Sequence, residues 1–227
     1  MGYSLYLDYF IIIATLVITI GADAFIKTTY NKTKKIESKK GMNGHDTARK
    51  ILDKNDLKNV TINEVAVELA DHYDPRTKQV TISTDVYRLE SLASISVAAH
   101  ECGHALQDKE GYVFLKIRRS IVPIVNLASS LGYVAIMIGL FAGLLKFLWL
   151  GILLEVVILA FQLITLPVEF NASHRALIQI KELGIVDDEE IKYCKKMLTA
   201  AALTYVASVT TSILEILRLV LIARRDD

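Results

Sequence analysis

Four long apolar stretches constrain the fold of this 227-residue chain more strongly than any other feature. A helix needs about 20 apolar residues to cross the hydrocarbon core of a bilayer, and each stretch is near that length. Hydrophobic residues make up 52% of the chain, which is high for a soluble domain, yet 22% of the residues are charged. We therefore expect a mainly α membrane protein with a small α+β polar domain.

The chain is expected to cross the membrane three or four times. The predicted spans cover residues 5–26, 121–143, 147–166 and 198–223. The second and third form a hairpin that turns at 144–146. The fourth carries Glu215 and Arg218, an i,i+3 pair that either neutralises itself in lipid or indicates a helix packed against protein. The third carries Glu155, for which we expect pairing with Arg218.

These spans predict the order of the chain's parts. The expected organisation is an N-terminal transmembrane anchor (1–26), a zincin-like catalytic region (27–119), a transmembrane hairpin (120–166), a helical segment (167–197) and a C-terminal transmembrane or membrane-associated helix (198–227). Ala22-Asp23-Ala24 resembles a signal-peptidase site, but residues 1–8 contain no Lys or Arg to act as a positive leader. We therefore expect the first stretch to be retained as an anchor.

Basic residues predict the orientation of the spans. They gather after the first span and before the second, at Lys27, Lys32, Lys34, Lys35, Lys39, Lys40, Lys116, Arg118 and Arg119. The positive-inside tendency places this polar region in the cytoplasm, beside the cell membrane. A fourth true span would leave Arg224 and Arg225 outside, against the same tendency. The number of crossings therefore stays open.

Net charge and cysteine content exclude two other classes of protein. A formal net charge of +1 gives no basic face for nucleic acid, so no polynucleotide partner is expected. Two cysteines, Cys102 and Cys194, cannot form a disulfide framework. A lipid bilayer and a peptide or protein substrate, with membrane proteins among the candidates, are the expected partners.

The residues His100-Glu101-Cys102-Gly103-His104 form the HExxH pattern of zinc hydrolases. Residues four apart share a face of a helix, so the two imidazoles can bind one Zn²⁺ while Glu101 reaches the adjacent water. Ser91 and Ser94 are N-cap candidates, and Gly111 marks the helix end. The alternative is a chance match on a solvated helix. Cys102 lies about 100 degrees further round the helix than Glu101 and is expected to pack instead of binding zinc.

The polar block before this motif predicts a small helix and a short sheet. Helical spacing begins after Asp46 or Thr47 and closes near Asn55. Residues 60–70 and 78–83 have strand character and are separated by the turn-forming residues 74–77, which predicts a β-hairpin. If the strand at 78–83 is an edge, it can align an extended substrate by main-chain pairing.

A hydrolytic zinc site has three protein ligands, and Glu169 is the candidate for the third. Pro167 is expected to begin the helix that carries it. Two predicted spans separate His104 from Glu169, so the chain returns to the same side of the membrane. Asp108 shares a face with the histidines but lies roughly 6 Å further along the axis, too far for coordination beside both.

Two segments together resemble a known family. The HExxH helix after Asp-His-Tyr-Asp-Pro, with the later Leu-Pro-Val-Glu-Phe-Asn-Ala-Ser, resembles the YugP-like family of membrane-bound neutral zinc metallopeptidases over most of the chain. It is more distantly similar to gluzincin peptidases of the HtpX and CAAX prenyl protease group. The resemblance implies that His100, His104 and Glu169 bind zinc and that Glu101 is the catalytic base.

One position departs from the more distant group, which has an aspartate four residues beyond its third ligand. Here that position is Ser173. Asn171, Asp108 and Asp71 are the alternatives for holding the histidines. Candidates for stabilising the oxyanion of a peptide hydrolysis are His174, His72, Arg175 and Tyr73.

The expected activity is metal-assisted hydrolysis of peptide bonds. A protease that cuts within the bilayer is disfavoured, because charged residues flank the motif too closely for it to lie on a spanning helix. The remaining alternative is a non-catalytic membrane scaffold or transporter with a structural metal site. Such a site would have a fourth protein ligand.

Overall fold

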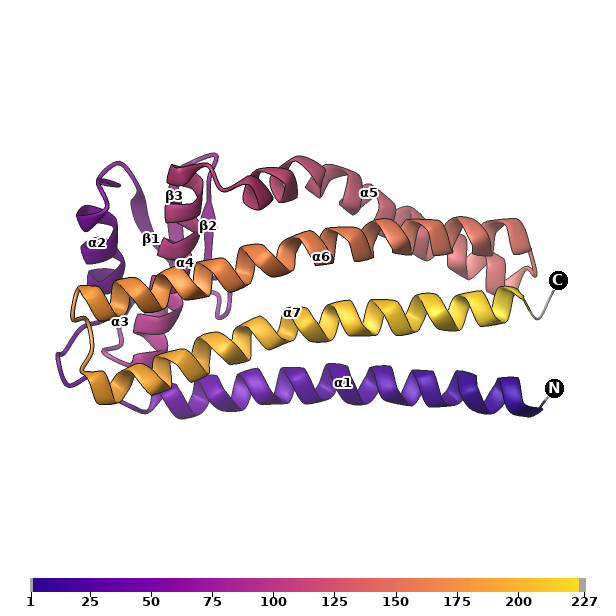
Figure 1. Cartoon of the computed structure of the whole chain (residues 1–227), viewed down its shortest axis with the longest axis horizontal. Coiled ribbons are helices and arrows are strands. Elements are labelled where there is room, and N and C mark those ends of the chain that lie inside the picture. The colour runs from indigo at the N-terminus through magenta and orange to yellow at the C-terminus, as the bar shows by residue number, and fades with distance from the viewer. Residues whose placement is uncertain (1, 225–227) are drawn as a thin grey trace. The chain divides into compact units, whose positions relative to one another are not determined.

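The computed structural model describes residues 2–224, with side chains from Tyr6 onward, and is mainly helical (Figure 1). The helices are α1 (Gly2–Lys34), α2 (Gly44–Lys54), α3 (Thr84–Arg88), α4 (Leu92–Glu110), α5 (Val113–Phe141), α6 (Leu145–Glu182) and α7 (Asp188–Ala223). The strands are β1 (Thr61–Val65), β2 (His72–Asp74) and β3 (Gln79–Ser83).

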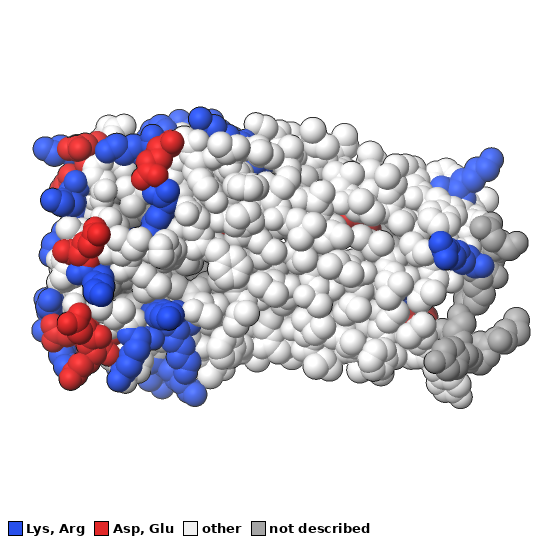
Figure 2. Space-filling model, viewed as in Figure 1, with Lys and Arg blue, Asp and Glu red and all other residues white. Residues whose placement is uncertain are grey.

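The chain divides into two compact units, and the four long helices α1, α5, α6 and α7 each contribute residues to both. Unit 1 comprises the described parts of Met1–Asp23, Lys116–Leu166 and Thr204–Asp227. Unit 2 comprises Ala24–Leu115 and Pro167–Leu203. On the face shown in Figure 2, the charged side chains gather mainly over unit 2, while most of the surface of the long helices is uncharged. Each unit is described separately below.

Unit 1 consists of segments of four helices, each long and apolar enough to cross a membrane by length and composition. Large apolar side chains on these segments are exposed, including Phe10 (67%), Leu127 (61%) and Leu153 (60%). Such a surface is suited to lipid contact. Figure 2 shows this white surface on one face of the molecule. The predicted spans therefore correspond to α1, α5, α6 and α7.

Small residues permit close packing of α5 against α6 within unit 1. A Cβ added at Gly139 would lie 2.7 Å from the Leu148 backbone nitrogen, and one added at Gly151 would lie 2.5 Å from Ile136 Cγ1. Small residues are the usual means by which helices approach closely in membranes. The connection runs through residues 142–144, where Gly143 adopts φ +66°.

The ion pair on α7 forms as predicted, but the expected partner of Glu155 does not. Arg218 binds Glu215 through Nη2 at 2.5 Å, and its Nη1 lies 3.6 Å from Asp8 of α1. The prediction that Glu155 pairs with Arg218 is wrong, since the guanidinium already faces these two carboxylates. An i,i+3 partner on the same helix meets it at little cost in chain entropy.

Helix α2 begins slightly before the predicted position. Asn43 is the N-cap residue, and its side chain accepts a hydrogen bond from the Asp46 backbone N–H. The helix begins at Gly44, so the predicted start at Asp46 or Thr47 was late. The Asn43 cap satisfies a backbone N–H of the first turn, which allows the helix to begin earlier. The predicted end near Asn55 is confirmed, since Asn55 is the C-cap residue.

The three-stranded sheet has the order β1-β3-β2, which corrects the predicted hairpin. β2 pairs antiparallel with β3 across the predicted turn at 74–77, whereas β1 pairs with β3 in parallel. The partner of β3 across this turn is therefore a short strand at 72–74 and not residues 60–70. β3 is the central strand, so the expectation that it is an edge open to substrate is also wrong. Its alternate residues Val80 and Ile82 are fully buried, as suits a central strand.

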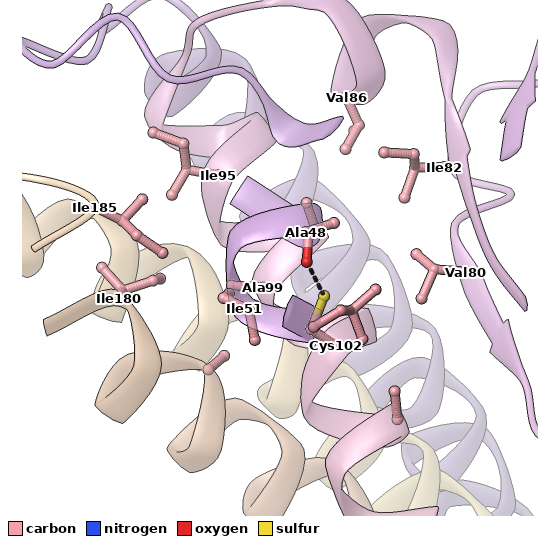
Figure 3. Packing of buried hydrophobic residues seen from close by; sticks show 14 of the residues in the cluster. Ala48, Ile51, Val80, Ile82, Val86, Ile95, Ala99, Cys102, Ile180 and Ile185 are labelled. Carbon is pink, nitrogen blue, oxygen red and sulfur yellow. Dashed lines mark hydrogen bonds between the residues drawn. The ribbon is translucent and has the colours of Figure 1, made fainter. Parts of the chain in front are cut away.

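The core of unit 2 lies between the sheet, α2, α4 and the parts of α6 and α7 in this unit. Figure 3 shows Ile51 of α2, Val80 and Ile82 of β3, and Ile180 of α6 around it. Cys102 of α4 points into this core, with its thiol 3.7 Å from the Ala48 carbonyl oxygen. Burial raises the pKa of the Cys102 thiol. The prediction that Cys102 packs is confirmed.

Helix α6 continues through Pro167, where the sequence predicted a helix start. It runs unbroken from Leu145 to Glu182, so the third predicted span and the segment with Glu169 are one helix. Proline lacks the N–H that would bond to the carbonyl four residues earlier, but the hydrogen bonds before and after it maintain the helix.

Candidate metal centre

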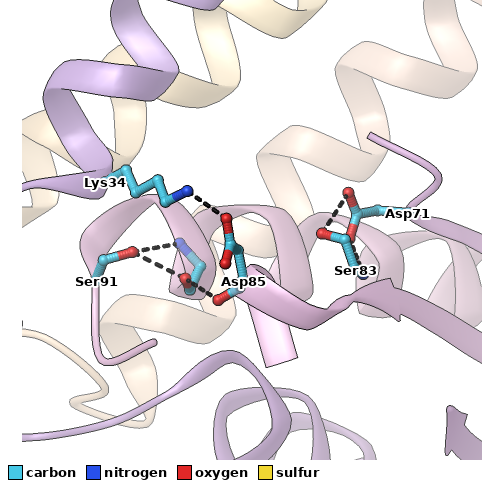
Figure 4. Close-up of polar contacts among 6 residues, drawn as sticks. Lys34, Asp71, Ser83, Asp85 and Ser91 are labelled. Carbon is cyan, nitrogen blue, oxygen red and sulfur yellow. Dashed lines mark hydrogen bonds and ion pairs between the residues drawn. The ribbon is translucent and has the colours of Figure 1, made fainter. Parts of the chain in front are cut away.

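Helix α4 has well-defined ends, as the sequence predicted. The Ser91 side chain accepts a hydrogen bond from the Ser94 backbone N–H at 3.1 Å, and Gly111 ends the helix with φ +69°. Ser94 also donates to the Asp85 carbonyl at 3.2 Å, and Lys34 pairs with the Asp85 side chain (Figure 4). These contacts fix the start of the helix that carries His100, Glu101 and His104.

Gly103 allows α4 and α6 to approach closely at the level of the motif. A Cβ at this position would lie 2.4 Å from the Ala172 carbonyl oxygen of α6, closer than side chains are found. The backbone of α6 is therefore in contact with the HExxH turn. Glu169 lies about one helical turn before Ala172, so this close approach brings its side chain to the two histidines.

His100, His104 and Glu169 lie together, as predicted. The Glu169 Oε2 atom is 3.3 Å from His100 Nε2 and 3.6 Å from His104 Nε2. The ligand atoms of the three residues all lie within 4.8 Å of one another. Within the described part of the chain, no fourth His, Cys, Asp or Glu side chain joins these three.

The two distances from Glu169 to the histidines fit a tetrahedral zinc ion. Zinc binds nitrogen and oxygen ligands at about 2.0–2.2 Å, which places two ligands of one tetrahedron about 3.3–3.6 Å apart. Both distances from Glu169 to the histidines lie in this range. Two imidazoles and one carboxylate are also a donor set that zinc accepts. The residues present therefore fit zinc.

Burial strengthens the interactions within this group. Glu169 is 2% exposed and His104 is 8% exposed. Burial acts to lower the pKa of His104, but its contact with the Glu169 carboxylate outweighs this and the pKa is raised. Protonation of His104 and metal binding therefore compete for the same ring.

Glu101 adjoins the group without belonging to it. It is 7% exposed, and burial raises its pKa above the usual range for a carboxyl group. The neighbouring imidazoles of His100 and His104 act in the opposite direction and lower the pKa of Glu101. A raised pKa brings a carboxyl group closer to the range in which it can both accept and donate a proton.

Each histidine has a second contact through its Nδ1 atom. Ser173 Oγ lies 3.2 Å from His100 Nδ1. The serine that replaces the aspartate of the more distant peptidase group therefore contacts a histidine itself. Gln107 Oε1 lies 3.0 Å from His104 Nδ1. The sequence analysis missed Gln107. Its position three residues after His104, on the same helix face, was the available signal.

The other candidates for holding the histidines have different partners. Asn171 contacts Gln107 at 3.0 Å and so meets His104 only indirectly. Asp108 accepts from Tyr73 Oη at 2.8 Å and pairs with Lys78. Asp71 accepts from the Ser83 backbone N–H at 2.7 Å (Figure 4). No hydrogen bond from Asp108 or Asp71 to either histidine is found among the described residues.

The oxyanion candidates are also placed by the structure. The His72 ring lies 2.7 Å from the Ala70 carbonyl oxygen, and the side chain is exposed. His174 is exposed on α6, and the Arg175 guanidinium binds Glu110 at 2.6 and 2.7 Å. Tyr73 donates to Asp108. Their role as oxyanion donors stays a prediction.

The geometry brings three candidate metal ligands together on two packed helices. The chain matches the family described as "Putative neutral zinc metallopeptidase" over residues 8–224. It is also 44% identical over 213 residues to "Putative membrane protease YugP" of Bacillus subtilis (strain 168), which covers 94% of this chain and 95% of that protein. No solved structure matches significantly.

The chain belongs to this neutral zinc metallopeptidase family, because the match covers nearly its whole length. Its cofactor is zinc. The resemblance noted from the two sequence segments is confirmed.

Proposed function

We propose that this protein is a membrane-bound zinc endopeptidase in which Glu101 is the general base. The observation that carries the proposal is the position of the buried Glu101 beside a three-membered group of zinc-compatible ligands. The family supports peptide hydrolysis in general terms. The roles of individual residues follow from their chemistry.

His100 and His104 would hold zinc through their Nε2 atoms, and Glu169 would hold it through Oε2. When bound, zinc supplies a Lewis acid that activates water and polarises the peptide carbonyl. Glu101 accepts the proton of the attacking water. It then donates this proton to the departing amine as the C–N bond breaks.

The number of ligands favours hydrolysis over a structural metal site. Structural zinc sites have four protein ligands, whereas catalytic sites have three and leave a position for water. The ligand group within residues 2–224 has three members. The scaffold or transporter alternative requires a fourth, so the donor set supports the peptidase.

We further propose that the site works at the cytoplasmic face of the cell membrane. The lysines that follow the first span and the basic residues before α5 support this orientation. Labelling of a Lys35→Cys variant with a membrane-impermeant maleimide tests it. Labelling should appear only after the cells are permeabilised, and labelling of intact cells would place this region outside.

The proposed activity is tested by comparing wild type with Glu101→Gln, using the full chain in detergent or liposomes. Casein and a membrane peptide serve as substrates, and bound zinc is measured in each sample. Because proton transfer by a positioned side chain contributes about 10²- to 10⁴-fold, Glu101→Gln should lose cleavage by that factor and retain zinc. Glu182→Gln, at an exposed position of α6, is the matched control and should cleave as wild type does.

Two outcomes would contradict the proposal. Cleavage by Glu101→Gln at the wild-type rate would remove Glu101 from the mechanism. Zinc binding without cleavage of any substrate by wild type, together with a fourth protein ligand, would favour the scaffold.

A further inference from the structure

The buried Gln107 connects His104 to a chain of hydrogen bonds between α4 and α6. Its side chain is fully buried, and its Oε1 atom lies 3.0 Å from His104 Nδ1. Its Nε2 atom donates to the Val168 carbonyl at 2.7 Å and to Asn171 Oδ1 at 3.0 Å. All polar atoms of the side chain therefore have partners.

These partners fix which way the amide of Gln107 faces. The Val168 carbonyl can only accept a hydrogen bond. Asn171 Oδ1 accepts a second hydrogen bond, from Arg175 Nε at 2.7 Å, which identifies it as the oxygen of its amide. The NH₂ group of Gln107 must face these two acceptors, so its oxygen faces His104.

An amide oxygen beside His104 Nδ1 requires a proton on that nitrogen. In the neutral ring, Nε2 then carries the lone pair, and Nε2 is the atom that lies 3.6 Å from Glu169. His100 differs, because the Ser173 hydroxyl beside its Nδ1 can either donate or accept and imposes no tautomer.

We propose that Gln107 is a positioning residue that holds His104 as the Nδ1–H tautomer, with Nε2 directed to the metal. The inference rests on the proposed zinc site and adds a residue to which no role has been assigned.

The hydrogen bonds further from His104 hold Gln107 in place. Arg175 binds the Glu110 carboxylate through two nitrogens, at 2.6 and 2.7 Å, while its Nε atom holds Asn171. Two-point binding of this kind sets direction as well as distance. The series of hydrogen-bonded side chains Glu110, Arg175, Asn171, Gln107 and His104 thus runs between α4 and α6 and ends at a proposed ligand.

The test measures the tautomer directly in the full-length protein in detergent. Histidine is labelled with ¹⁵N, and the zinc-free protein is compared with the zinc-loaded protein, with His104 assigned through a His104→Gln variant. At a pH high enough for the His104 ring to be neutral in the zinc-free protein, its Nδ1 should give the signal of a protonated ring nitrogen and its Nε2 the signal of a bare one. A protonated Nε2 with bare Nδ1 would overturn the inference without the need for any Gln107 substitution.

Zinc affinity, measured by competition with a chelator, provides the second readout. Gln107→Met keeps a similar side-chain length but cannot accept from His104, and loss of such a supporting contact should weaken zinc binding by about 10- to 100-fold. Gln179→Met is the matched control, because Gln179 bonds to Asn55 in the same unit and has no contact with a histidine. It should bind zinc as wild type does.

The outcomes separate the two proposals. If wild type binds zinc and cleaves while Gln107→Met binds zinc equally well, the role of Gln107 is refuted and the peptidase stands. If wild type binds no zinc at this site, the proposed function fails, and the tautomer measurement on the zinc-free protein still decides how His104 is held.

Discussion

Unit 1 and unit 2 differ in where their apolar side chains lie: many are buried in unit 2, whereas many are exposed in unit 1. Unit 2 buries them in one continuous core between the sheet and its helices, with Ile51, Ile82 and Ile95 fully inaccessible. The second buried cluster, in unit 1, centres on Leu148, Ile152, Leu219 and Ala223, while many large side chains of that unit face outward. Unit 2 is thus stabilised by its own packing, whereas unit 1 needs lipid around it.

The three candidate metal ligands all belong to unit 2, which has the larger buried core. Cys102 and Ala99 of α4 lie within that core, while Glu101 and His104 of the same helix lie outside the cluster of core residues. A catalytic group must be held within a fraction of an ångström, and a well-packed helix provides this better than a loop. The comparison therefore predicts that the two units respond differently to matched substitutions.

The largest effect is expected from a cavity in the core of unit 2. Ile51→Ala removes a fully buried side chain and should destabilise the unit by about 2–5 kcal/mol. Hydrogen exchange of the α4 amides measures this locally. Val67→Ala, at a position 61% exposed in the same unit, is the control. Equal protection in the two variants would show that the core does not hold α4.

A charge on the outer surface should distinguish the units next most strongly. Leu153 in unit 1 and Val67 in unit 2 are almost equally exposed, at 60% and 61%. Leu153→Lys should cost about 2.5–3.5 kcal/mol of membrane insertion, because a lysine near the centre of a span is poorly tolerated. Val67→Lys should change stability by less than about 0.5 kcal/mol.

An insertion assay on the 147–166 segment measures the first effect, and hydrogen exchange of unit 2 measures the second. If Leu153→Lys inserts as efficiently as wild type, the surface of unit 1 does not face lipid at this position.

A smaller effect is expected from two glycines on helices. Gly103→Ala forces a methyl group against the Ala172 carbonyl, and such overpacking should cost about 1–3 kcal/mol and weaken zinc binding. Gly21→Ala has no atom within 4 Å of the added carbon, and should be neutral or stabilise its helix by up to about 1 kcal/mol. Unchanged zinc affinity in Gly103→Ala would mean that α4 and α6 need not approach so closely.

The sequence predicted those features that depend on local chemistry. The serine cap at Ser91, the glycine end at Gly111 and the long apolar spans each follow from a few neighbouring residues. The proximity of His100, His104 and Glu169 was also predicted, since two of them share a helix face and two intervening spans return Glu169 to the same side of the membrane. The family resemblance is confirmed by the comparison over nearly the whole chain.

The features that were missed depend on contacts between distant segments. The parallel pairing of β1 with β3 leaves no turn signal, so the adjacent hairpin was preferred. Pro167 inside α6 resembles a helix start unless the continuous hydrogen bonding on both sides is known. The spacing of Gln107 from His104 shows that the two side chains share a helix face, but the orientation of the Gln107 amide depends on Val168 and Asn171 of α6.

A crystal structure of the zinc-loaded protein, with the metal located by its anomalous scattering, tests the central claim most directly. The account predicts zinc at about 2.0–2.2 Å from His100 Nε2, His104 Nε2 and a Glu169 oxygen, with a water as the fourth ligand. Zinc at another position, or a fourth protein side chain in place of the water, would contradict it.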